Sequence, residues 1–145
     1  MLFRSAVTVP IYSAGTDGYR ADAAAQRIIA DLERARRNAK FTGVSREVDF
    51  SVGNNRYDVL GLPDPDDPTA ALYRVDLDNT PYPATLVSVV FSRAAGGPDD
   101  KIKFDMYCRP TVSADALVSG TIVVESGSEQ RTIVVDPVTG ESSLQ

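Results

Sequence analysis

Hydrophobic residues recur at helical spacing in the first third of the chain. They follow one another at alternating steps of four and three residues: Ala21, Ala25, Ile28, Leu32, Ala35 and Ala39. This spacing places them on one face of an α-helix, with charged residues around the rest of its surface. The pattern predicts an amphipathic helix over about residues 17–40, capped by Thr16 or Asp17 and stopped at Gly43. We expect the apolar stripe to pack as core, mainly toward the C-terminal end of the helix.

After residue 40 the hydrophobic period changes to two, which is typical of β-strands. Residues 44–52 and 56–60 predict a hairpin around the turn-forming residues Gly53, Asn54 and Asn55. Residues 61–68 contain three prolines and predict a loop. Residues 101–107 alternate, with Ile102, Phe104 and Met106 predicted on one face. Further strands are predicted at residues 71–77, 84–92 (apolar throughout and expected to be central), 120–125 and 131–136.

These elements predict an α+β fold, in which a long N-terminal helix packs on antiparallel β-sheets, arranged as a small β-sandwich. A chain of 145 residues has the size of one domain. We therefore assign residues 1–40 to the helix and residues 41–145 to an antiparallel β domain, the two forming one structural unit.

Charge is distributed unevenly along the chain. Residues 1–46 carry eight basic and four acidic side chains, a net charge of +4. Residues 47–145 carry seven basic and sixteen acidic side chains, a net charge of −9. An acidic body repels a phosphate backbone, which disfavours broad nucleic-acid binding. The basic helix is suited to an acidic neighbour or an anionic membrane surface.

The residue types for common catalytic sites are scarce. The chain has no histidine, which excludes a histidine general base, a histidine-activated nucleophile and a histidine-liganded zinc. The single cysteine, Cys108, has no partner for an internal disulfide and is interpreted as a small packed side chain. We expect no enzyme activity and no cofactor.

Acidic residues gather in two predicted loops. Asp64, Asp66 and Asp67 lie within residues 61–68, and they are weak candidates for calcium ligands together with Asp76 and Asp78. Their order differs from an EF-hand loop, so a solvated acidic loop is the preferred interpretation, with no metal. Asp99 and Asp100 close a second loop, residues 94–100. Both loops are expected to serve recognition, because exposed loops on a rigid sheet commonly do.

Three segments together resemble the GspH/FimT-type minor pseudopilins of type II secretion and type IV pilus systems. Residues 6–13 (AVTVPIYS) resemble the end of the pilin transmembrane helix, and residues 23–40 resemble the amphipathic helix that follows it. Residues 104–110 (FDMYCRP) resemble the family's F-x-x-x-G-x-P turn, with Cys108 in place of the glycine. Residues 120–124 and 131–140 resemble its closing hairpin, R-x-I-x-V-x-x-x-T-G. The family's cleavage motif and apolar helix are not among these residues, so we expect a truncated N-terminal helix.

The resemblance implies a structural role. A minor pseudopilin takes part in assembling or capping a secretion pseudopilus or a type IV pilus, with other pilin subunits and secreted protein cargo as partners. It implies an inner-membrane anchor and a periplasm-facing domain, while the chain as given is expected to be soluble. Assembly is expected to use the helix residues Ala21, Ala25, Ile28, Leu32 and Ala35, with residues 21–25 protruding to pack in a filament.

Two other functions stay open at this point. The first is a DNA-binding minor pilin of a competence system. It is disfavoured because Arg34, Arg36 and Arg37 are spread around the helix, and because the C-terminal tail, residues 140–145, has no basic residue. The second is an acidic, metal-dependent carbohydrate-binding or hydrolase module.

Overall fold

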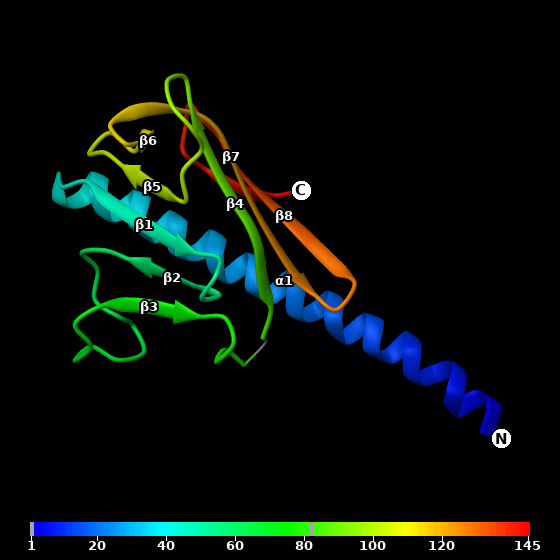
Figure 1. The fold of residues 1–145 in the computed structure, drawn as a ribbon. Helices are drawn as coiled ribbons and strands as arrows, with labels where there is room; N and C mark the ends of the chain where they lie inside the picture. Colours follow the sequence, from blue (N-terminus) through cyan, green and yellow to red (C-terminus); the bar gives the residue numbers. More distant parts are fainter. Residues whose placement is uncertain (1, 82) are drawn as a thin grey trace.

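One helix and nine strands form the described part of the chain, residues 2–81 and 83–145, in a computed structural model (Figure 1). Side chains are described from residue 15 onward, except at position 82. The elements, in order, are α1 (Leu2–Thr42), β1 (Arg46–Ser51), β2 (Arg56–Val59), β3 (Tyr73–Asp76), β4 (Thr85–Arg93), β5 (Lys101–Phe104), β6 (Pro110–Val112), β7 (Asp115–Ser126), β8 (Glu129–Val135) and β9 (Ser142–Leu144). The predicted α+β class is confirmed.

Helix α1 is longer than the sequence pattern predicts. It runs for 41 residues, which corresponds to about 60 Å. The predicted cap at Thr16 or Asp17 is wrong, because the helix continues through both residues. Asp17 instead accepts a hydrogen bond from the hydroxyl of Ser126 in β7. The predicted stop is confirmed: Gly43 has a φ of 70°, and its N–H donates to the carbonyl of Ala39 at 3.0 Å.

The strands form one continuous, curled antiparallel sheet. Its order is β3-β2-β1-β5-β6-β7-β8-β9, and β4 pairs with β7 beside this path. Residues 120–125 of β7 pair with both β4 and β8, so these two strands lie on opposite edges of β7. Figure 1 shows the helix passing behind the sheet, with its N-terminal part extending beyond the strands.

The core lies between the helix and the inner face of the curled sheet. Helix α1 packs against β1, β5, β7, β8 and β9. The ring of Phe50 in β1 lies 5.2 Å from the ring of Tyr57 in β2 and 5.9 Å from that of Phe91 in β4. These contacts join β1 and β2 to β4, and the three rings belong to the same buried cluster as the helix residues Ile28 and Leu32.

Two sequence expectations about the strands are wrong, and one strand was not predicted. Among the described residues, strand β4 pairs with β7 on one edge only, and of its nine residues only Leu86 and Phe91 are buried, so it is not central. Met106 lies beyond the end of β5 in a turn and is exposed, so it does not share the buried face of Ile102 and Phe104. The strand that was not predicted is β9 in the C-terminal tail, which pairs with β8. Backbone pairing drives this last addition, and pairing does not require apolar side chains.

Candidate functional site

The apolar stripe of the helix packs into the protein's own core. Ala21, Ala25, Ile28, Leu32 and Ala35 are all at most 1% exposed. Ala21, Ala24 and Ala25 are therefore already covered by the β domain, contrary to the expectation that residues 21–25 protrude, and only Asp22 and Ala23 between them are partly exposed. The part of α1 that extends beyond the strands precedes them, as Figure 1 shows. Pro10 and the rest of residues 6–13 lie within this part as helical backbone, and their side chains are outside the described set.

The hairpin of β7 and β8 holds the helix where it leaves the body. Arg131 in β8 donates from Nε to Asp22 Oδ1 at 2.6 Å. Its guanidinium also pairs with Glu129 at 3.3 Å, and the Ser126 hydroxyl contacts Asp17 at 3.3 Å. Polar contacts across one helical turn thus set the direction in which the preceding residues extend.

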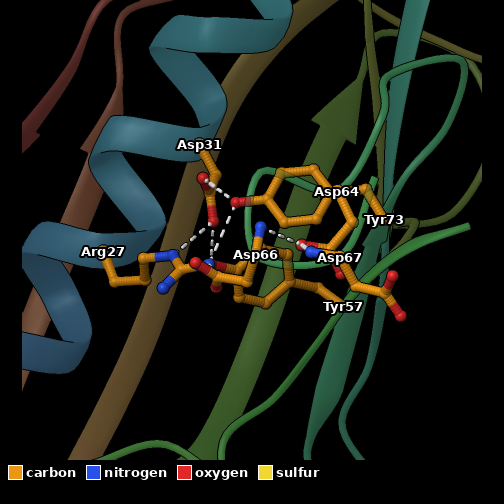
Figure 2. A network of polar contacts seen from close by, with 7 residues as sticks. All are labelled: Arg27, Asp31, Tyr57, Asp64, Asp66, Asp67 and Tyr73. Carbon is orange, nitrogen blue, oxygen red and sulfur yellow. Dashed lines mark hydrogen bonds and ion pairs between the residues drawn. The ribbon is translucent and has the colours of Figure 1, made fainter. Parts of the chain in front are cut away.

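A buried polar network connects the middle of the helix to strands β2 and β3. Asp31 is 5% exposed, and both its carboxylate oxygens accept hydrogen bonds from tyrosine hydroxyls. Tyr57 of β2 donates to Oδ2 and Tyr73 of β3 donates to Oδ1, each at 2.5 Å. Arg27 adds a donor from one turn earlier in α1, at 3.1 Å from Asp31 Oδ2 and 3.1 Å from the Tyr73 hydroxyl (Figure 2).

The electrostatics of this network favour a neutral pair of tyrosines around a carboxylate. Burial raises the pKa of Tyr57 well above its ordinary value, and the neighbouring Asp31 raises it further. Burial and the hydrogen bond to Asp31 raise the pKa of Tyr73 to about 12. Since both carboxylate oxygens are already occupied, Asp31 holds elements together and is not an open general base.

The acidic loop of residues 61–68 is organised by its own carboxylates. Asp64 accepts from the backbone N–H groups of Asp66 at 2.8 Å and of Asp67 at 3.4 Å. Asp67 accepts from the hydroxyl of Thr69 at 2.6 Å, and Asp66 pairs with Arg27 at 3.6 Å. The loop therefore reaches the margin of the polar network, as Figure 2 shows. Within the described residues, no group of three or more His, Cys, Asp or Glu side chains is placed to hold a metal ion.

The second predicted recognition loop ends beside the strands. Asp99 makes both backbone hydrogen bonds of a bridge to Phe91 in β4, and its carboxylate accepts from the Asp100 N–H and the Ser113 hydroxyl. Burial acts to raise the pKa of Asp99, but these hydrogen bonds outweigh it and lower the pKa. Burial and the adjacent Asp99 raise the pKa of Asp100. The hydrogen bonds of Asp99 therefore fix the backbone of the turn that precedes β5.

Cys108 lies in the turn between β5 and β6, has a left-handed backbone conformation and contacts the C-terminal part of α1. Its φ is 65°, a value that favours glycine, and its Sγ lies 3.6 Å from the Arg36 carbonyl of α1. A side chain on Gly140, whose φ is 75°, would meet the carbonyl oxygen of Cys108 at 2.8 Å. The FDMYCRP turn and the closing Thr139-Gly140 turn therefore pack together against α1.

Three arginines in the C-terminal half of the helix have partners in the protein. Arg36 pairs with Glu33 at 3.0 Å and Glu141 at 3.6 Å, and Arg37 reaches Glu33 at 3.6 Å. Arg34 lies over the ring of Tyr73, 5.6 Å from its centroid. Arg34 and Arg36 are thus engaged inside the protein, whereas the side chain of Arg37 is 80% exposed.

Sequence reasoning missed the polar network. Asp31 adjoins the apolar stripe, three residues after Ile28 and one before Leu32, and a carboxylate in that position signals burial. Its tyrosine partners lie 26 and 42 residues away along the chain, so no local pattern connects them. The described part of α1 contains no stretch that is both long enough and apolar enough to cross a membrane. No family model, curated protein or solved structure matches the chain.

Proposed function

We propose that this chain is the periplasm-facing part of a minor pseudopilin, with a pilin-like fold, and that it serves as a structural subunit in a secretion pseudopilus or type IV pilus. One observation carries the proposal. Helix α1 is continuous from Leu2 to Thr42, yet only its C-terminal part is embedded in the sheet. A helix that both contributes to a domain core and extends from it suits a subunit that packs against other helices.

The turn geometry at the other end of the helix supports the same proposal. The family resemblance expects glycine in the turn after Phe104, and Cys108 adopts the left-handed backbone that glycine adopts most easily. Gly140, which ends the resembling hairpin, is also left-handed and packs against that turn. The two resembling segments are separate along the sequence, and their turns pack together in space.

The mechanism under this proposal is assembly. The extending part of α1 packs with helices of neighbouring subunits, and membrane anchoring precedes that step. The curled sheet contributes the small β-sandwich of the pilin-like fold and presents residues 61–68 and 94–100 to neighbouring subunits or to secreted cargo. No catalytic step is required of any residue.

Site-specific crosslinking in cells tests the proposal. A photoreactive phenylalanine analogue replaces Tyr19, which is 59% exposed in α1, or Tyr107, which is 68% exposed in the β5–β6 turn. Both replacements exchange an exposed tyrosine for a similar aromatic, so they form a matched pair. We expect crosslinks from position 19 to the helices of pilin-like subunits, and none to these helices from position 107.

The same experiment identifies the competing outcomes. Equal crosslinking from both positions, or no pilin-like protein among the products, contradicts the proposal. Salt-dependent binding of duplex DNA in a gel-shift assay would favour the DNA-binding minor pilin instead.

A further inference from the structure

Strand β4 presents an unusual open edge. Eight of its nine residues pair with β7 on one side, while the other side is bridged only at Phe91 within the described residues. From Thr85 to Ser92 the strand contains no charged residue and no proline. Proteins usually protect such edges with lysine, proline or inward-pointing charges. Here the edge is protected only by a bulge at Val87, by Asn55 at one end of the strand and by Asp99 near the other.

The register identifies the backbone groups that face outward. Phe91 exchanges both backbone hydrogen bonds with Asp99, each at 2.9 Å, on the side away from β7. Residues alternate along a strand, so the N–H and C=O of Val89 point to the same outer side. Among the described residues, neither group of Val89 forms a hydrogen bond there.

The covered ends show what chemistry the edge accepts. At one end, the carboxamide of Asn55 accepts from the Leu86 N–H at 2.6 Å and donates to the Ala84 carbonyl at 2.8 Å. This is the donor–acceptor pair that a peptide group of a neighbouring strand supplies. At the other end, the Asp99 backbone supplies the same pair to Phe91. Strand-like partners therefore bracket an open stretch of about four residues, Val87 to Val90, about 13 Å long.

We propose that this open edge, Val87–Val90, binds a short, uncharged, extended segment of a partner protein by β-strand addition. Backbone groups of Val89 supply the pairing, and Val87 and Val90, 38% and 37% exposed, supply contacts for β-branched side chains of the partner. A second copy of the chain is a poorer occupant. Four residues of edge fall far short of the roughly 1,200 Å² that a stable interface needs, and each copy carries a net charge of −5.

A peptide with the uncharged sequence of residues 119–124, SGTIVV, is a suitable probe because that segment of β7 already pairs with the inner edge of β4. With lysines added at both ends and a fluorescent label, its binding to the full chain is followed by anisotropy. We expect a dissociation constant on the order of 100 μM, with slowed hydrogen exchange of the Val89 amide.

Two sets of variants separate strand addition from nonspecific apolar contact. Peptides are N-methylated on one or the other set of alternate amides, and strand addition requires that one set abolishes binding while the other retains it. In the protein, Val87→Lys is expected to weaken binding at least about tenfold. Val118→Lys, at a 55% exposed valine of β7, is the matched control and is expected to change it less than about twofold.

Three results would overturn the inference. The first is no binding up to about 1 mM peptide. The second is equal loss with both methylated peptides or with both lysine variants. The third is a concentration-dependent dimer that Val87→Lys removes, which would assign the edge to a second copy. None of these results bears on the proposed pilus role, which rests on α1.

Discussion

Replacing Asp31 with alanine tests whether the buried network holds the β2–β3 arm against the helix. The substitution leaves the hydroxyls of Tyr57 and Tyr73 without their acceptor, and both residues are at most 1% exposed. A hydrogen bond to a charged group contributes about 1.5–3 kcal/mol, and an orphaned buried hydroxyl costs about 1–3 kcal/mol. Tyr73 keeps a contact with Arg27, which limits its loss.

Other terms change the expected destabilisation only slightly. Alanine favours the helix over aspartate by roughly 0.5 kcal/mol. Arg27 is partly exposed, so the loss of its pairing with Asp31 is largely compensated by solvent. We expect Asp31→Ala to lower the free energy of unfolding by about 3 kcal/mol, at the lower end of the range for breaking a buried ionic network.

The matched control is Asp58→Ala. Asp58 pairs with Arg74 at 2.7 Å, but the arginine side chain is 43% exposed. Loss of such a surface pair is expected to cost under about 1 kcal/mol. Urea unfolding followed by circular dichroism measures both variants, since the chain has no tryptophan for a fluorescence signal. Equal destabilisation of the two variants would refute the assigned role of Asp31, as would an Asp31→Ala protein that unfolds at the wild-type midpoint.

Further predictions concern pH, a strained turn and a close contact. Burial raises the pKa of Tyr73 from 10.0 to about 12, so the neutral side chain contributes its full stability below pH 10 and this contribution is lost as the pH rises toward 12. Thermal melts over this interval should therefore show that Tyr73→Phe loses less stability than wild type. Since Cys108 is left-handed, chemical unfolding should show Cys108→Gly within about 1 kcal/mol of wild type or more stable, and Cys108→Val destabilised by about 1–2 kcal/mol relative to the glycine variant. A Cβ on Gly120 would lie 3.0 Å from the Phe91 ring and 3.2 Å from Val135, so Gly120→Ala should lower the unfolding free energy by about 1–3 kcal/mol, and an unchanged urea midpoint would contradict this packing.

Much of the fold follows from local patterns. The helical stripe from Ala21 to Ala39 and the stop at Gly43 are each specified by residues within a few positions of one another. The hairpin of β1 and β2 and that of β7 and β8 are specified in the same way. The start of α1 was misplaced because capping residues such as Asp17 also serve tertiary contacts, and here Asp17 contacts Ser126.

The position of a strand within the sheet is not a local property. The apolar sequence of β4 resembles a central strand, but its neighbours are decided by where β5 and β7 run, and this leaves one edge of Val87–Val90 open. The burial of Asp31 likewise depends on two tyrosines from distant strands. The sequence alone determined the α+β class, the helix face and most strands, because periodicity and turn chemistry act over a few residues. Only the tertiary structure decided the buried network, the direction of the extending helix and the open edge, because each arises where segments far apart in the chain meet.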